Sequence, residues 1–493
     1  MEHHVTNRLN VTSAVMVATF LKAMDSTVVS TAMPTIVSDL GGIKLFSWVF
    51  AVYLLTTAVT TPIWGKLADL FGRKRVFAIG TALFLLGSMF SGMSQTMQQL
   101  IGFRAFQGIG AGAVFPITLT IIGDLYELRQ RAQMQGLFSA VWGISGILGP
   151  LVGGFFVDNL TWRWIFYINV PIGLASIIMI WVFLYEHFEK KKKYIDYFGA
   201  ITFSVGIAAL LYGLLSGGGT YAWSSPILIG LFAIAAVFLA LFFVIEMRVP
   251  EPMLPLTLFK LRVISVSNLA SFLISGILIG LNAYLPLWIQ GILMHSATSS
   301  GLTLAPMSIG WPIGATIGGR LMLKLGSRKT TLIGMIALLG GSLWLSLVTM
   351  GSGQWQLVAI MLIVGFGFGF AMTAFTVLVQ SGVEWNLRGA ATASNQFMRT
   401  LGQTVGVAAF GTWFNQAIAS YALAHPTARG LLGAGMNRIL TPQTAHLLPL
   451  PTLLAMQHGL AYGLHGVYLS LSVLAAAGLL VVLWLPRHLP GLK

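Results

Sequence analysis

An acidic residue lies deep within the first long apolar segment of the chain, which runs from about residue 11 to 38. If this segment is a helix that enters a membrane near Val11, Asp25 lies about 14 residues in, or roughly 21 Å deep at 1.5 Å per residue. A carboxylate near the bilayer centre costs about 3 kcal/mol or more unless it is protonated, paired or hydrated, so such acids usually mark a functional site. We predict that Asp25 binds a proton or a cation.

Two basic residues are candidate partners for Asp25, and they imply different roles for it. Lys22 lies three residues earlier on the same helix face, and pairing with it would make Asp25 a neutralised structural acid. Arg104 lies within a later apolar segment and cannot shed its charge, so it needs an anionic partner or water. We predict that Asp25 and Arg104 form the coupling site. Pairing of Arg104 with backbone carbonyls is the structural alternative.

The apolar segments that carry these residues predict an all-α polytopic membrane protein. Hydrophobic residues make up 56% of the 493-residue chain and charged residues 8%, and the mean hydropathy is +0.84, which excludes a soluble protein of this length. Runs of about 18 or more apolar residues predict transmembrane helices. We expect fourteen of them, at about 11–38, 46–66, 76–95, 98–123, 134–157, 164–185, 197–216, 225–246, 263–291, 298–323, 330–350, 355–381, 390–423 and 456–485.

The distribution of basic residues predicts the orientation of these helices. With both termini in the cytoplasm, about 20 of the 28 Lys and Arg residues fall in cytoplasmic loops and ends, among them Arg73 to Arg75 and Lys190 to Lys193. This bias explains the net charge of +15 without nucleic acid. We predict a multi-pass protein of the cell membrane, with a first helix that is retained and not cleaved as a signal peptide.

Cysteine is absent, which excludes disulfides and thiol chemistry, and no cluster of metal-ligating residues stands out. No phosphate-binding Gly-x-x-x-x-Gly-Lys-Ser/Thr loop occurs, so we expect no ATP and no other cofactor. We therefore predict that the protein is not an enzyme and that a proton gradient is its energy source.

Two similar loop sequences divide the chain into halves. Residues 65–75 and 319–329 share glycines, Leu and paired basic residues at an offset of about 254 residues, and each follows the second helix of a six-helix half. Parallel halves around a site at the membrane midplane are typical of alternating-access transporters. We predict a cytoplasmic N-terminus at 1–10, a first half at 11–185, two inserted helices with linkers at 186–262, a second half at 263–485 with an extracellular loop at about 424–455, and a cytoplasmic C-terminus at 486–493.

Several motifs in this order resemble one family. Residues 65–75 resemble the loop signature of the major facilitator superfamily, residues 104–112 its fourth-span motif, and residues 146–154 its fifth-span antiporter motif. Residues 25–34 and 162–173 look like hallmarks of its fourteen-span drug:proton antiporter branch, and residues 285–290 and 396–402 are similar to that branch too. The resemblance implies a major facilitator fold and a proton-coupled antiporter that exports lipophilic drugs or toxic compounds, which we expect to be cationic, by alternating access.

Two of these motifs have a physical interpretation. In the loop motif, salt bridges could latch one access state and break in the other, or the basic residues could merely anchor the helix ends. The predicted latch residues are Gly65, Asp69, Gly72, Arg73 and Arg129. In the antiporter motif, small residues three and four apart let helices approach closely, either to seal the cavity against protons or as ordinary packing. These residues are Gly146, Gly149, Pro150, Gly153 and Gly154.

Aromatic and amide side chains within the predicted helices are candidates for a cavity lining that adapts to varied lipophilic cations. They are Tyr53, Trp142, Asn282, Tyr284, Gln290 and Gln380, together with Arg399. Each aromatic residue could instead face lipid. The expected partners are small lipophilic substrates, protons and membrane lipids, with no nucleic acid and a monomeric state. A lipid or glycolipid translocase of the same fold is the alternative function, and a non-transporting sensor is a third.

Overall fold

The computed structural model describes residues 7–126, 128–186, 196–217, 221–249, 252, 256–384, 387–432, 435–440 and 442–486. Within these ranges the chain is helical, with fourteen α-helices of 15 residues or more and no β-strand. In a membrane the backbone polar groups must bond within the segment, so apolar segments of this length fold as helices.

The long helices of the first part are α1 (Arg8–Leu40), α2 (Phe46–Phe71), α3 (Arg73–Met93), α4 (Met97–Leu125), α5 (Leu128–Asn159) and α7 (Asn169–Phe183), with the short α6 (Trp164–Tyr167) before α7. Two helices follow, α8 (Tyr197–Ser216) and α9 (Pro226–Glu246). The last part holds α10 (Arg262–Leu287), which continues into the π-helical turn η3 (Trp288–Ile292), and α11 (Ala297–Leu325), α12 (Ser327–Ser346), α13 (Gln354–Ser381), α14 (Arg388–Ala424) and α17 (Leu450–Val482).

Eleven helical segments of the described chain are long and apolar enough to cross a membrane. The three long helices outside this set are α1, α11 and α14. Two of them carry intramembrane charges, since α1 holds Lys22 and Asp25 and α14 holds Arg399. The polar residues that lower the hydropathy of these helices are therefore candidates for function.

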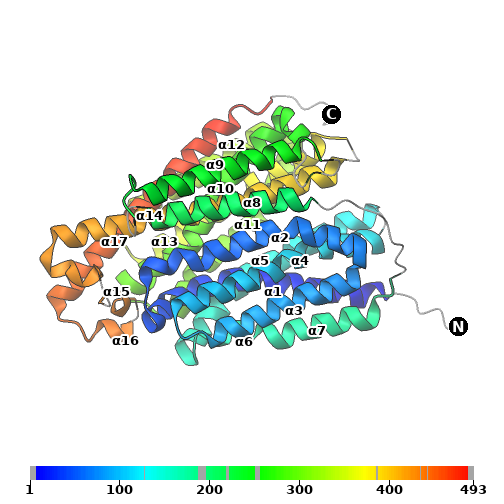
Figure 1. The fold of residues 1–493 in the computed structure, drawn as a ribbon. Coiled ribbons are helices and arrows are strands. Elements are labelled where there is room, and N and C mark those ends of the chain that lie inside the picture. The colour runs from blue at the N-terminus through cyan, green and yellow to red at the C-terminus, as the bar shows by residue number, and fades with distance from the viewer. Residues whose placement is uncertain are drawn as a thin grey trace.

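The helices gather into two groups. The first group comprises α1 to α7 and the second comprises α10 to α17, while α8 and α9 pack on each other, and α8 also contacts α2 and α14. Between the groups, α5 packs against α11 and α2 packs against α14. Figure 1 shows the first group, which begins in blue, beside the second group, which ends in red, with the two diverging toward the end at which α1 begins and α17 ends. We call this the terminal end of the bundle and the opposite end the distal end.

The two loop repeats have the same backbone conformation. Gly72 joins α2 to α3 with φ of 88°, and Gly326 joins α11 to α12 with φ of 80°. Each glycine N–H also closes the preceding helix, on the carbonyl of Ala68 (3.1 Å) and of Met322 (3.0 Å) respectively. Because a positive φ is costly for any residue with a Cβ, both repeats need glycine at this position. The internal repeat in the sequence thus corresponds to a repeated turn.

Polar contacts join the two groups at the distal end. The hydroxyls of Ser47 and Tyr284 lie 2.8 Å apart, and Gln290 Nε2 donates to the carbonyl of Thr31 at 2.9 Å. Asp158 at the end of α5 accepts hydrogen bonds from the first two backbone N–H groups of α11, at 3.2 and 2.8 Å. An acid at a helix N-terminus is favoured by the helix dipole. The distal end is therefore closed in this structure.

The connection between α14 and α17 adds to this closure. It contains η5 (Pro426–Leu432), α15 (Gly435–Arg438) and α16 (Pro442–Ala445), and α15 contacts the end of α1. Ile439 and Leu440 are fully buried in the hydrophobic core that both groups share. The described part of this connection is thus a folded cap over the distal end.

Candidate functional site

Asp25 lies in the middle of α1, is only 1% exposed and accepts three hydrogen bonds. Arg104 Nη1 on α4 donates to Asp25 Oδ2 at 2.8 Å. The other oxygen, Oδ1, accepts from Gln107 Nε2 at 2.9 Å and from Asn169 Nδ2 at 3.2 Å. One carboxylate thus ties α1 to α4 and α7 through one charged and two amide donors.

Arg104 is as deeply buried as its partner, with 1% exposure. Its Nη1 also donates to Gln107 Oε1 at 2.7 Å, one helical turn along α4, and its guanidinium carbon lies 3.9 Å from the centre of the Tyr53 ring. A buried ion pair of this kind needs such additional hydrogen bonds, because desolvation offsets much of the Coulomb attraction. The observed partner of Arg104 is therefore the carboxylate and not a backbone carbonyl.

A second layer of contacts orients Asn169. Its Nδ2 also donates to Ser88 Oγ at 3.0 Å, and that hydroxyl donates to the carbonyl of Phe166 at 2.9 Å. Gln107 lies within the motif at residues 104–112 and Asn169 within the motif at residues 162–173, both of which resemble family motifs. Their positions along the chain, however, do not indicate that their side chains contact Asp25. Ser88 on α3 carries no such signal at all.

Three buried polar atoms around Asp25 have no hydrogen-bond partner among the described residues. They are Tyr53 Oη, Arg104 Nε and Asn169 Oδ1. Buried polar atoms are nearly always paired, so unpaired ones beside one carboxylate indicate a place for water or for a polar group of a ligand.

Lys22 does not neutralise Asp25 in this structure. It makes no ion pair with any acid that the structure describes, and its Nζ lies 5.6 Å from the centre of the Phe115 ring on α4. The pairing of Asp25 with Lys22, which the sequence left open, is therefore not the one observed.

The second group has a polar cluster without an acid. Asn395 Nδ2 on α14 donates to Asn268 Oδ1 and to Ser271 Oγ on α10, both at 2.9 Å. One turn further along α14, Arg399 Nη2 donates to the Met372 carbonyl at 3.1 Å and to Thr376 Oγ1 at 3.0 Å. Among the residues that the structure describes, the buried acid in the middle of a helix thus lies in the first group.

The predicted cavity residues do not gather in one place. Tyr53 adjoins Arg104, whereas Tyr284 and Gln290 are buried in the distal contact between the groups. Gln380 donates to Thr392 Oγ1 at 3.4 Å near the terminal end, Asn282 is half-buried on α10, and Trp142 is 41% exposed. A shared role as substrate lining stays a prediction.

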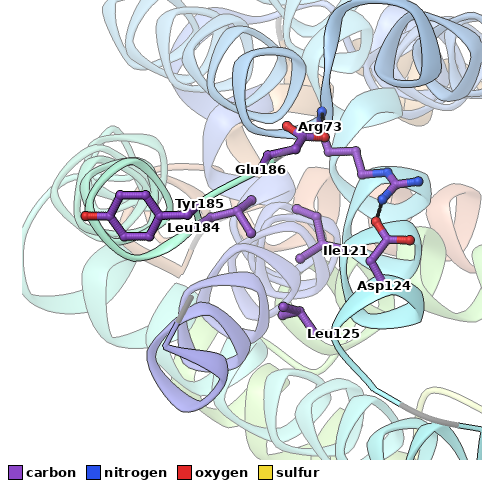
Figure 2. Close-up of a pocket in the computed structure, with 7 residues that line it drawn as sticks. All are labelled: Arg73, Ile121, Asp124, Leu125, Leu184, Tyr185 and Glu186. Atoms are coloured by element: carbon purple, nitrogen blue, oxygen red, sulfur yellow. Dashed lines mark hydrogen bonds and ion pairs between the residues drawn. The ribbon is translucent and has the colours of Figure 1, made fainter. Parts of the chain in front are cut away.

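The predicted latch is only partly described. Gly65 and Gly72 lie on and after α2, whereas the side chains of Asp69 and Arg129 lie outside the described part of the structure. Figure 2 shows Arg73 at the start of α3, where it forms an ion pair with Asp124 at the end of α4. Glu186 accepts from the backbone N–H groups of Arg73 and Lys74, at 2.9 and 3.1 Å.

These groups surround a pocket of about 340 Å³ at the terminal end, which is lined by Arg73, Ile121, Asp124, Leu125, Leu184, Tyr185 and Glu186 (Figure 2). All of these residues belong to the first group. The observed contacts of Arg73 therefore brace one group, and a latch formed by the loop motif stays a prediction.

The antiporter motif positions α5 between its neighbours. A Cβ at Gly149 or Gly153 would meet Thr27 or Val28 on α1 at 3.0 Å or less, and one at Gly154 would meet the backbone of Thr298 on α11 at 2.4 Å. Gly146 has the same relation to Ser308, and Pro150 lies inside the helix. Glycine at these positions lets α5 approach α1 and α11 closely, and a role of the motif in sealing the cavity stays a prediction.

Comparison with known proteins agrees with this architecture. The family model of the Major Facilitator Superfamily matches residues 15–197 and 188–407. The chain is 44% identical over 392 residues to multidrug resistance protein 3 of Bacillus subtilis, covering 80% of this chain and 77% of that protein. It is 38% identical over 403 residues to the multidrug transporter protein MdtP of the same organism, covering 82% and 74%.

Among solved structures, a bacterial homologue of the human lysosomal transporter Spinster, in an inward-facing and unoccupied conformation, aligns with a TM-score of 0.70 over 98% of each chain at 15% identity. At this identity the likeness concerns the fold. The helical bundle around Asp25 is thus a transporter fold, and the chain belongs to the major facilitator superfamily.

Proposed function

We propose that this protein exports lipophilic drugs or toxic compounds from the cytoplasm across the cell membrane in exchange for protons. Support for drug efflux comes from the names of relatives that share up to 44% identity with the chain. Support for proton coupling comes from the buried ion pair of Asp25 and Arg104. Acids within a membrane cost free energy and typically mark proton or ion pathways.

In the proposed cycle, Asp25 changes partners. In the observed arrangement it accepts from Arg104, Gln107 and Asn169. A proton that binds to either carboxylate oxygen removes the charge that holds Arg104, and a cationic group of the substrate competes with that proton for the same carboxylate. Competition for one site is sufficient to couple two opposite flows, provided that the two groups of helices alternate between closure at one end and closure at the other.

The closed distal end suggests from which side the substrate enters. Contacts such as Ser47 to Tyr284 and Asp158 to α11 join the groups there, while the groups diverge toward the terminal end. With the termini in the cytoplasm, this is the inward-facing state of a monomeric transporter with fourteen spans. Substrate enters from the terminal end, and the distal contacts break to release it outside.

The test is transport of ethidium by the purified protein in lipid vesicles. An outward-directed pump reconstituted inside-out should accumulate ethidium when the lumen is acidic, and a proton ionophore should abolish the accumulation. The control variant Glu384→Gln removes an exposed acid of the described chain and should transport like wild type. Ethidium transport by wild type and by Glu384→Gln that does not depend on the pH gradient would contradict proton exchange. Transport of fluorescent lipids in place of ethidium would favour a lipid translocase.

A further inference from the structure

The charges in the middle of the described helices do not balance. Asp25 is the single acid there, and Arg104 already pairs with it. Lys22 on α1 and Arg399 on α14 are two more basic residues at similar depth, about 14 and 11 residues from the terminal-end starts of their helices, or roughly 21 and 17 Å. Two intramembrane cations therefore lack an anion among the residues that the structure describes.

Lys22 has an unusually poor set of partners. Its side chain is partly exposed, its Nζ lies 5.6 Å from the centre of the Phe115 ring, and it forms no hydrogen bond or ion pair with any residue that the structure describes. It shares a helix face with Asp25, yet the two make no ion pair. An ammonium held inside a membrane without an acid or a carbonyl is available for an anionic group of a ligand.

Arg399 is satisfied only in part. Met372 and Thr376 on α13 supply a carbonyl and a hydroxyl to one nitrogen, but both are neutral, and the buried Nε has no partner in the described chain. A guanidinium matches a carboxylate in shape and charge, and it cannot become neutral by losing a proton. Arg399 is thus a second position where the bundle favours a carboxylate.

We propose that the preferred substrates are lipophilic zwitterions, whose cationic group competes with the proton at Asp25 while their carboxylate binds Lys22 or Arg399. This inference rests on the proposed function and names its substrate class. A purely cationic compound would meet two uncompensated positive charges. A purely anionic one would be attracted more strongly when Asp25 is protonated, which would couple the flows in the same direction instead of exchanging them.

The test is equilibrium binding of two dyes that differ only in the carboxylate. Tetramethylrhodamine is a zwitterion, and its methyl ester is a cation of the same size. Fluorescence anisotropy with purified protein in detergent requires no gradient, so the result is independent of whether a proton gradient drives transport. The variants are Lys22→Gln, Arg399→Gln and both together, and Lys324→Gln, an exposed lysine near the end of α11, is the matched control.

Wild type should bind the acid more tightly than the ester, and the preference should fall about tenfold or more in the double variant, equivalent to about 1.4 kcal/mol. The ester should still bind the variants, which shows that they are folded, and Lys324→Gln should keep the wild-type preference. The inference is overturned if wild type prefers the ester or binds neither dye, or if the preference survives the loss of both Lys22 and Arg399.

Discussion

At the scale of single residues, one carboxylate lies deep in the middle of the described helices. Asp25 is buried and accepts hydrogen bonds from Arg104, Gln107 and Asn169, which come from two other helices. Because the site also contains unpaired polar atoms at Tyr53, Arg104 and Asn169, it is not a closed structural network. The arrangement suits an acid that must change partners during a cycle.

This pairing predicts strong coupling between two substitutions. Arg104→Ala should lower the stability of the protein by about 3–5 kcal/mol, because it leaves the buried carboxylate of Asp25 uncompensated. Adding Asp25→Asn should recover much of that loss, since no buried charge then remains. The measurement is the thermal unfolding of the four proteins of the double-mutant cycle in one detergent. Additive effects of the two substitutions would contradict a direct charge pair.

At the scale of helices, Glu186 supports the start of α3. Its carboxylate accepts two backbone N–H groups that have no partner within the helix, at 2.9 and 3.1 Å. Glu186→Gln keeps the size of the side chain but removes the charge, so we expect a loss of about 1 kcal/mol in the free energy of unfolding. Thermal unfolding checks this, with Glu384→Gln as the control. The role of Glu186 as a cap of α3 would be refuted if Glu384→Gln lowered the free energy of unfolding while Glu186→Gln left it unchanged.

The sequence predicts the positions of the helices well and the contacts between their side chains poorly. Apolar runs locate the body of each helix, but α5 begins at Leu128 and not at about 134, because a helix continues through polar residues until its hydrogen bonds end. Depth in the membrane singles out Asp25. The proximity of Ser88 and Asn169, or of Arg73 and Asp124, depends on how separate helices pack, which spacing along the chain does not encode.

At the scale of the whole molecule, the two groups of helices must separate at the distal end during transport. A covalent link between Ser47 and Tyr284, whose hydroxyls lie 2.8 Å apart, should prevent this. The chain has no native cysteine, so a Ser47→Cys, Tyr284→Cys double variant offers two unique thiols. We expect a short bifunctional thiol reagent that is cleaved by reduction to stop transport by this variant, and a reductant to restore it.

The single-cysteine variants serve as controls for that experiment and should keep their activity after the same treatment. Full transport by a quantitatively cross-linked double variant would show that the distal contact does not open, and rigid-body alternation of the two groups would then be wrong for this protein.

The central claim is that substrate and proton compete for Asp25. The most direct measurement is proton release when a lipophilic cation binds to the purified protein in weakly buffered detergent, followed with a pH-sensitive dye over a series of pH values. The account predicts release of protons by wild type and by Glu384→Gln, and none by Asp25→Asn, although that variant is folded. Equal proton release by Asp25→Asn, or tight binding to wild type without release at any pH, would contradict it.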